Sequence, residues 1–358
     1  MSGITDHLVL RTIEGAADLL IEELRAMASI HSIRQASVDT VECTLNGPLD
    51  ELAACALYST VAVRDLDQSL RSGLLSSLSP VRFRVGTADP VRRREVINST
   101  EQQFGWVNRP GDWDVNLLPS ADGWIGEFGP LSWTRRFGRL ERLPWSTNLI
   151  VAEVLVRLAK IRPTHRVLDP FCGTGTILHA VRRQHPTAHL LGLDHDARAL
   201  RLAADNALGD AVDSVLMNAL RGDGLPLARG SADALPLASG SVDRVVANLP
   251  FGKQVGSHRA NRTLYPAVLD EIARVLTSDG RAVLLTEDKR LLLGAVQRQN
   301  GLKVVRQRLL RYNGATPTAY ILTRTRPPRT ARRVISGSGS ENCLPDPQRR
   351  GPVVRLGR

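Results

Sequence analysis

The stretch that decides the fold is Asp169-Pro170-Phe171-Cys172-Gly173-Thr174-Gly175-Thr176. It follows a short apolar run at 166–168, which predicts a strand, and it precedes a helical pattern that starts at Thr176. Glycines in such a strand-to-helix turn let a ligand approach backbone amides closely. A dinucleotide fingerprint would need a third glycine where Leu178 stands, and a phosphate-binding loop would need a Gly-Lys-Thr or Gly-Lys-Ser sequence that does not follow. The stretch is therefore either a binding turn for another ligand or an ordinary tight turn.

Regular alternation of strands and helices surrounds this turn. The expected helices cover 147–160, a segment from Thr176, a segment from Ala197 and 264–276, and the expected strands cover 166–168, 190–193, 242–247 and 282–286. Such alternation predicts a parallel sheet covered by helices on both faces. Two last strands, 303–311 and 318–324, are separated by Asn313-Gly314-Ala315-Thr316-Pro317 and are expected to form an antiparallel pair. The region 144–326 is thus predicted to be an α/β domain.

Further polar residues stand at the ends of neighbouring strands. Asp194 lies 19 residues after Gly175, at the end of the second strand, where it could accept hydrogen bonds from ribose hydroxyls. Asp233 follows in a loop, and the strand 242–247 runs into Asn248-Leu249-Pro250-Phe251. Either carboxylate alone could instead cap a helix or close an Asx turn. Because ligands of open α/β sheets bind at the carboxyl ends of the strands, the ordered set predicts one site there.

The ordered set resembles the class I S-adenosylmethionine-dependent methyltransferases that methylate exocyclic amines, whose signature is (Asn/Asp)-x-Pro-(Phe/Tyr). The resemblance implies S-adenosyl-L-methionine as the cofactor and no metal. It implies that Asp169 and the glycines after it hold the methionine portion, that Asp194 holds the ribose, and that Asp233 faces the adenine amino group. The other residues that it assigns to the cofactor site are Thr147, Phe171, Cys172, Gly173, Thr174, Gly175, Thr176, His195, Ala232, Ala234 and Asn248.

The residues Asn248-Leu249-Pro250-Phe251 suit the methylation of an aromatic amine. The lone pair of such a nitrogen is delocalised into the ring, so the nitrogen is a poor nucleophile until its geometry moves towards tetrahedral. The Asn248 side-chain oxygen and a backbone carbonyl of the turn, that of Leu249, could each accept one N–H bond and orient the lone pair. Pro250 restrains the turn, and Phe251 could stack on the base. The alternative is that these residues only end a strand and that Phe251 belongs to the core.

A narrower resemblance is to the THUMP-domain tRNA guanine-N2 methyltransferases, and it covers most of 144–325. The residues that carry it are Leu249 within the signature, Gly252-Lys253 after it, Asn261, Leu264-Tyr265-Pro266 and Arg281-Ala282-Val283-Leu284-Leu285-Thr286. It implies a Rossmann-like methyltransferase domain over 144–326, with a seven-stranded sheet and a closing antiparallel hairpin. Asn248 departs from the aspartate that close relatives often have, but it keeps the acceptor oxygen.

The N-terminal part is predicted to bind RNA. Thr12-Ile13-Glu14-Gly15 resembles the ferredoxin-like opening segment of the same family, and the arginine-rich stretch at 81–106 resembles its THUMP module. The resemblance implies an α+β RNA-binding region over 1–143 that grips the tRNA acceptor stem through phosphates and shape while a guanine flips into the catalytic domain. The candidate RNA-contacting residues are Arg82, Arg84, Arg92, Arg93, Arg94, Arg135, Arg136 and Lys253. The alternative for these cations is an ordinary solvated face.

The pattern of apolar residues is less regular in this N-terminal region than in 144–326. The expected strands cover 8–11, 38–45 and 81–85, and the expected helices cover 18–27, 49–59 and a segment that starts near Arg92. In the strand 81–85, strict alternation directs Val81, Phe83 and Val85 to a core and both arginines to the opposite face.

Composition fits a two-domain protein with a polyanionic partner. The chain has 358 residues, 42% of them apolar and 23% charged, which excludes wholesale disorder, collagen-like repeats and a membrane bundle. Its 47 basic and 36 acidic residues give a net charge of +11, which favours polyanionic partners. Residues 327–358, rich in Pro, Gly, Ser and Arg, are expected to form a basic disordered tail.

The cysteines and the first residues predict a cytoplasmic protein. Cys43, Cys55, Cys172 and Cys343 have neither the spacing of a zinc site nor that of a disulfide framework. The first residues lack the pattern of a signal peptide, and no apolar run is long enough to span a membrane. We therefore expect no membrane partner.

Three other functions remain compatible with these residues. One is methylation of guanine N2 in ribosomal RNA, and a second is methylation of a DNA or protein amine by a protein with an unrelated N-terminal adaptor. A third is RNA binding without catalysis, which predicts no affinity for the cofactor. The methylated nucleotide, an activating protein subunit and the oligomeric state are left open.

Overall fold

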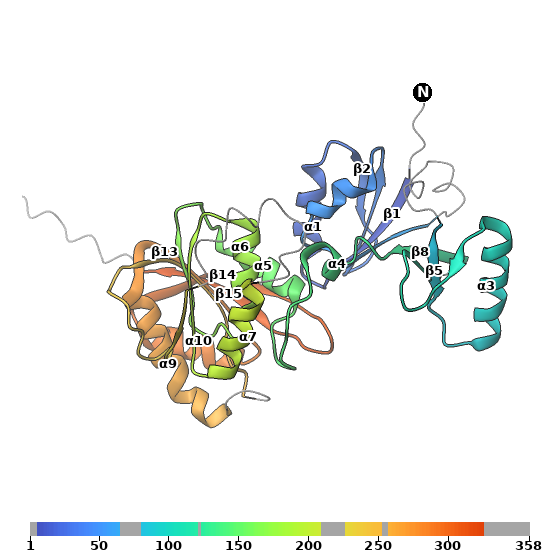
Figure 1. The fold of residues 1–358 in the computed structure, drawn as a ribbon. Coiled ribbons are helices and arrows are strands. Elements are labelled where there is room, and N and C mark those ends of the chain that lie inside the picture. The colour runs from blue at the N-terminus through green and yellow to red at the C-terminus, as the bar shows by residue number, and fades with distance from the viewer. Residues whose placement is uncertain (1–5, 65–79, 121–122, 209–225, 253–256, 326–358) are drawn as a thin grey trace, which may run out of the picture. The chain divides into compact units, whose positions relative to one another are not determined.

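A seven-stranded sheet forms the C-terminal part of the computed structural model, which describes residues 6–64, 80–120, 123–208, 226–252 and 257–325 (Figure 1). Its strands are β9 (Arg166–Asp169), β10 (His189–Asp194), β11 (Leu227–Arg229), β12 (Val242–Asn248), β13 (Leu276–Thr286), β14 (Leu302–Leu309) and β15 (Thr318–Arg324). They lie in the order β11-β10-β9-β12-β13-β15-β14, with the first five parallel and β15 antiparallel to both of its neighbours. This confirms the expected Rossmann-like sheet with a closing antiparallel hairpin.

The helices of this part cover strands that are apolar on both faces. They are α5 (Leu149–Ala159), α6 (Thr176–Gln184), α7 (Ala197–Leu208), α9 (His258–Val275) and α10 (Lys289–Arg298). In β13, residues 282–285 are 0% exposed, as expected of a parallel strand between two layers of helices. Full burial of a valine or leucine side chain contributes about 1.5–3 kcal/mol, so this core holds the strand ends firmly in place.

A second, mixed sheet forms the N-terminal part and realises the expected α+β region. Its strands are β1 (Asp6–Arg11), β2 (Ile30–Gln35), β3 (Thr40–Leu45), β4 (Thr60–Val63), β5 (Arg82–Val85), β6 (Val107–Asn108), β7 (Val115–Ser120) and β8 (Gly123–Phe128). They lie in the order β2-β3-β1-β4-β8-β7-β5-β6, so one sheet runs through both predicted modules. The helices are α1 (Ala17–Arg25), the 3-10 helix η1 (Leu49–Ala54), α3 (Pro90–Phe104) and α4 (Trp133–Phe137).

The expected helix at 49–59 is wrong beyond Ala54. The chain there is held by side chains instead of by helical hydrogen bonds, because the Glu23 carboxylate accepts from the backbone N–H groups of Ala56 (3.1 Å) and Leu57 (3.3 Å). The Tyr58 hydroxyl donates to the Leu52 carbonyl at 2.8 Å. These contacts turn the chain into β4.

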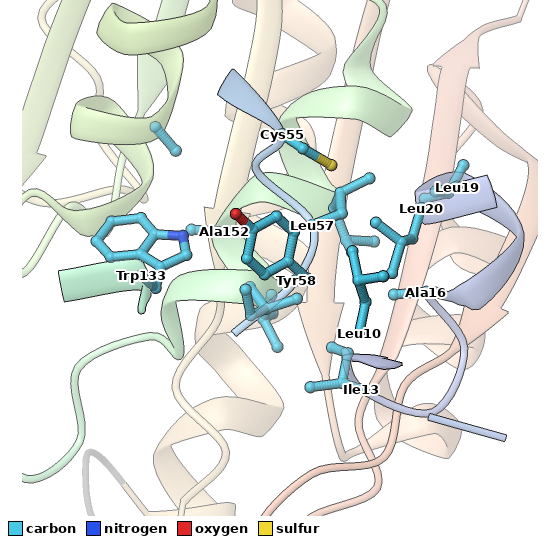
Figure 2. Close-up of a cluster of buried hydrophobic side chains, with 14 of the residues drawn as sticks. Leu10, Ile13, Ala16, Leu19, Leu20, Cys55, Leu57, Tyr58, Trp133 and Ala152 are labelled. Atoms are coloured by element: carbon cyan, nitrogen blue, oxygen red, sulfur yellow. The ribbon is translucent and has the colours of Figure 1, made fainter. Parts of the chain in front are cut away.

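A hydrophobic core connects the first sheet with α5. Tyr58, Trp133 of α4 and Ala152 of α5 belong to it and are 0%, 4% and 0% exposed (Figure 2). The described residues, up to Thr325, form one compact unit. The domain boundaries expected after residues 143 and 326 therefore stay predictions. Lys253 and the expected tail, 327–358, lie outside the described residues.

The described residues were also compared with the requirements of membrane-spanning helices and of metal sites. None of the helices described combines the length and the apolar character that a membrane-spanning segment needs. Within the described ranges, no three His, Cys, Asp or Glu side chains are grouped so that they could hold a metal ion. Cys43, Cys55 and Cys172 are free and buried, and burial raises the pKa of the Cys43 thiol to about 12.

Candidate active site

The turn after β9 places two glycines at the carboxyl edge of the sheet. Gly175 caps α6 in the left-handed region with φ 79°, and a Cβ there would lie 3.2 Å from Ala203 Cβ of α7. Gly173 also has a positive φ, 53°, and apart from Gly173 itself and its two chain neighbours no described residue has an atom within 4 Å of the position of a Cβ there. Open space beside a glycine backbone is what the close approach of a ligand requires.

Asp169, the last residue of β9, carries a buried acceptor oxygen. Its side chain is 1% exposed, and Oδ1 accepts from the Phe171 N–H at 3.0 Å. Oδ2 is buried and has no hydrogen-bond partner among the residues described. Burial, and to a lesser extent the nearby Asp194 carboxylate, raises the pKa of the Asp169 carboxyl well above its usual range. A buried oxygen of this kind indicates a place for a hydrogen-bond donor or a cation.

Asp194, at the end of β10, ties the turn to the next loop. Its Oδ2 accepts from the Gly173 N–H at 2.8 Å, and its Oδ1 accepts from the Asp196 N–H at 2.9 Å. His195 Nδ1 lies 3.3 Å from Oδ1, although the His195 side chain is 75% exposed. The structure thus brings together the predicted residues Asp169, Gly173 and Asp194.

The remaining residues of the turn after β9 are held by contacts with Leu193 of β10 and with Ser146 of the loop before α5. The Cys172 N–H donates to the Leu193 carbonyl at 2.9 Å. Thr174 is buried, and its Oγ1 lies 3.0 Å from the Ser146 hydroxyl. Phe171 is half-buried and Thr176 is buried, with its hydroxyl enclosed. These contacts make the turn a rigid platform.

The loop that contains Asp233 lies beside the end of β10. The Gly230 N–H donates to the Asp194 carbonyl at 3.1 Å, which brings the loop to the same edge of the sheet. Asp233 is exposed and accepts from the Ser231 hydroxyl. Ala232 is buried and Ala234 is exposed. The Asp233 side chain is therefore exposed to solvent in a short turn at this edge of the sheet.

Asn248 ends β12 with its amide fixed at one end only. Its Nδ2 donates to Thr147 Oγ1 at 3.1 Å. Its Oδ1 is buried and lacks a hydrogen-bond partner in the part of the chain that the structure describes. The next residue, Leu249, is 3% exposed and donates its N–H to the Leu285 carbonyl of β13 at 3.0 Å. The turn thus presents one buried amide oxygen at the carboxyl edge.

Two residues of α9 hold the turn after Asn248. The Pro250 carbonyl accepts from Asn261 Nδ2 at 2.6 Å and from the Tyr265 hydroxyl at 3.0 Å. No role for either residue was predicted, although their spacing of four on a helix indicates a shared face. Phe251 is half-buried and packs against the hydrophobic core.

The loop before α5 contacts both the turn after β9 and the turn after β12. Thr147 contacts Asn248, and Ser146 contacts Thr174, so adjacent residues contact both turns. Arg142 Nη2 donates to the backbone carbonyls of Ser146 (3.2 Å) and Thr147 (3.0 Å). Sequence patterns missed this role, because an arginine in a linker carries no periodic signal.

The predicted RNA-contacting arginines near β5 have partners within the protein. Arg82 pairs with Asp114, with 2.6 Å between Nη2 and Oδ1. The Arg84 and Arg135 guanidinium groups lie 4.1 Å and 5.3 Å from the centre of the Trp113 ring. The alternation predicted for this strand is confirmed, because Val81, Phe83 and Val85 are buried and both arginines are half-exposed.

Arg136 is half-buried and used internally. Its Nη2 donates to the Tyr58 carbonyl at 2.8 Å, and its guanidinium lies 3.7 Å from the centre of the Tyr58 ring. Burial lowers the pKa of Arg136 from its usual value. This environment favours a structural role for Arg136 over a contact with RNA.

Arg92, Arg93 and Arg94 are exposed near the start of α3. The helix starts there because Asp89 caps it, accepting from the N–H groups of Val91 (2.9 Å) and Arg92 (3.2 Å), and because Pro90 suits the first position. The expected helix start is confirmed. Within the predicted set, Arg135 is exposed as well. The Arg92 guanidinium lies 5.0 Å from the centre of the Trp124 ring, and Arg93 donates to the Thr87 carbonyl.

Comparison with known proteins locates the family resemblance in the C-terminal part. Residues 146–316 match the family described as RMKL-like, methyltransferase domain. A tRNA (guanine(6)-N(2))-methyltransferase THUMP3 from Bos taurus is 34% identical over 200 residues, 51% of this chain and 37% of that protein. A tRNA (guanine(6)-N2)-methyltransferase from Thermus thermophilus is 34% identical over 194 residues, 54% of this chain and 53% of that one. The chain thus spans about half or less of the length of these curated relatives.

Solved structures resemble almost the whole chain. The crystal structure of TrmN from Thermus thermophilus matches with a TM-score of 0.71 at 25% identity, covering 89% of this chain and 100% of that one. A putative methyltransferase complexed with SAH matches with a TM-score of 0.64 at 15% identity, covering 90% and 99%, and shares the fold.

Proposed function

From the match of residues 146–316 to the RMKL-like methyltransferase domain family, we propose that this protein methylates the N2 amine of a guanosine in tRNA, with S-adenosyl-L-methionine as methyl donor. The names of the relatives support tRNA as the substrate and guanosine 6 as the target nucleotide. One observation carries the proposal. Asn248 Oδ1 is a buried acceptor without a partner among the described residues, at the carboxyl end of β12.

The Asn248 turn has the acceptors that an exocyclic amine needs. An amine nitrogen presents two N–H donors, and holding both turns its lone pair towards the methyl donor. Asn248 Oδ1 would accept one of them. The Pro250 carbonyl is already used by Asn261 and Tyr265, which leaves the Leu249 carbonyl as the second acceptor. The nitrogen would attack the methyl carbon, S-adenosylhomocysteine would leave, and the methylated nitrogen would then lose one proton to solvent. Methylation would thus depend on positioning and not on an ionised base.

The residues around the β9 turn fit S-adenosyl-L-methionine. Asp169 Oδ2 is an unpaired buried oxygen suited to an ammonium group, and the backbone at Gly173 is open to close approach. Asp194 would accept from the ribose hydroxyls, and Asp233 would face the adenine amino group. Cys172, Thr174, Gly175 and Thr176 would form the floor. When bound, the cofactor supplies a methyl group that its sulfonium already activates.

The proposed division of labour follows the two sheets. Residues 1–143 would bind the tRNA acceptor stem, residues 144–326 would carry out methyl transfer, and residues 327–358 would form a basic tail. The net charge of +11 supports a polyanionic partner. The exposed arginines of α3 give this assignment a surface that can be tested.

Charge reversal of Arg92, Arg93 and Arg94 to glutamate is expected to weaken tRNA binding about tenfold or more at low salt. Each lost phosphate contact should also lower the slope of log affinity against log salt by about 1, so the slope flattens. Filter binding or fluorescence anisotropy across a salt series measures both. The matched control reverses Arg298, Lys303 and Arg306, three exposed cations of the C-terminal part. If both triple variants bind alike, the arginines of α3 are only a solvated face.

Methyl transfer to tRNA tests the proposed activity directly. Labelled S-adenosyl-L-methionine is incubated with the full-length protein and total tRNA that lacks native modifications, and the digested nucleosides are analysed by mass spectrometry. We expect N2-methylguanosine, located at position 6 by sequencing of the labelled fragment. Cofactor binding without transfer to tRNA would contradict the proposal, and parallel reactions with ribosomal RNA, DNA and protein would identify the substrate in that case. Failure to bind the cofactor would favour an RNA-binding protein without catalysis.

A further inference from the structure

A buried group of three side chains lies against the Asn248–Phe251 turn. Asn261 and Tyr265 come from α9 and Thr286 ends β13. Their side chains are 0%, 1% and 0% exposed. Burying three polar side chains is unfavourable unless their hydrogen bonds are made, so their arrangement needs a physical reason.

The hydrogen bonds of this group run in one direction. A tyrosine hydroxyl has a single proton, and Tyr265 donates it to the Pro250 carbonyl at 3.0 Å. The 2.8 Å contact between Tyr265 Oη and Thr286 Oγ1 is therefore donated by Thr286. Thr286 Oγ1 in turn accepts from the Asp288 N–H at 3.0 Å. The chain of donors thus starts at a backbone amide and ends at the Pro250 carbonyl.

The Pro250 carbonyl uses both of its lone pairs within the protein. It accepts from Asn261 Nδ2 at 2.6 Å as well as from Tyr265. The proline ring fixes φ, so rotation about ψ is the one soft torsion between this carbonyl and the preceding peptide bond. Holding the Pro250 carbonyl therefore restrains the plane that carries the Leu249 carbonyl. At the other side of that peptide, the Leu249 N–H is held by Leu285 at 3.0 Å. The direction of the Leu249 carbonyl is therefore set from both sides.

We propose that Tyr265 and Asn261 are positioning residues for the amine site: by holding the Pro250 carbonyl, they keep the Leu249 carbonyl turned towards the substrate amine next to Asn248 Oδ1. This inference rests on the proposed function. Neither residue touches substrate or cofactor in this account. Burial raises the pKa of Tyr265 to about 12, so its hydroxyl keeps the proton that it donates at neutral pH.

A double-mutant cycle with Tyr265→Phe and Thr286→Val tests the inference. Tyr265→Phe removes only the hydroxyl, and we expect kcat to fall about 10- to 100-fold, as misplacement of a reacting group does, with unchanged KM for tRNA and unchanged Kd for S-adenosyl-L-methionine. Thr286→Val should lower kcat less, and it should add nothing in the Tyr265→Phe background, because Thr286 acts on the turn through Tyr265. Tyr320→Phe, which alters a fully buried tyrosine of β15 in the same domain, is the matched control and should keep kcat.

A purely structural role gives a different pattern. Tyr265→Phe would then lower the melting temperature and leave kcat unchanged, and that outcome overturns the inference. Equal losses of kcat in Tyr265→Phe and Tyr320→Phe would overturn it as well. The same assay is run with whichever nucleic acid or protein amine the unaltered protein methylates. A protein that methylates an amine other than guanine N2 would contradict the proposed substrate and still leave the effect of Tyr265 measurable.

Discussion

Replacing Asn248 with alanine is expected to lower kcat about 100- to 1,000-fold, the usual cost of removing one preorganised polar contact at a reacting group. The physical reason is the unpaired Asn248 Oδ1, which would accept one N–H of the substrate amine. The Kd for S-adenosyl-L-methionine should stay close to that of the unaltered protein, because the Asp169, Gly173 and Asp194 group does not depend on this amide. Single-turnover methyl transfer and calorimetry measure the two quantities.

The control for this prediction is Asn248→Asp. An aspartate keeps the acceptor oxygens, and the Thr147 hydroxyl, which now accepts from Nδ2, can donate to a carboxylate. We expect Asn248→Asp to retain most of the activity that alanine loses. The Thr147 contact contributes about 1 kcal/mol, so the fold of both variants is checked by thermal unfolding. Unaltered turnover in Asn248→Ala would remove the amide from the mechanism.

The C-terminal sheet could be predicted from sequence because its strands lie between two layers of helices. Such strands are apolar on both faces, as residues 282–285 are, and they stand out between helical patterns. The N-terminal sheet gives a weaker signal. In β2, only Ile30 is fully buried, so no alternation marks the strand, and it was not predicted. The end of η1 was misjudged because Glu23, far away in sequence, holds the chain after it.

For the candidate site, too, some features could be predicted from sequence and others could not. Asp169, Asp194 and Asn248 each follow an expected strand, and in the structure they end β9, β10 and β12, so their place at one edge of the sheet could be predicted from sequence. The contacts that orient them could not. Thr147 reaches Asn248 across 101 positions of the chain, and only the packed structure brings them together. For the same reason Arg136 was assigned to RNA, although its guanidinium contacts the Tyr58 carbonyl.

Replacing Asp194 with alanine is expected to raise the Kd for S-adenosyl-L-methionine about 100-fold. The carboxylate has two tasks in this account. It accepts from the N–H groups of Gly173 and Asp196, which holds the turn and the next loop together, and it would also accept from the ribose hydroxyls. A hydrogen bond to a charged group is worth about 1.5–3 kcal/mol, and about 1.4 kcal/mol corresponds to a factor of ten in affinity. Loss of the ribose contacts alone accounts for the expected weakening.

A ribose analogue separates the two tasks of Asp194. Calorimetry compares S-adenosylhomocysteine with its 2′-deoxy analogue in the unaltered protein and in Asp194→Ala. If Asp194 holds the ribose, the unaltered protein binds the analogue more weakly and the variant no longer distinguishes the two ligands. If both proteins discriminate equally, Asp194 acts only on the turn through Gly173. Asp194→Asn, which keeps one acceptor oxygen, should lie between the two proteins in affinity, because it can retain only one of the two backbone contacts.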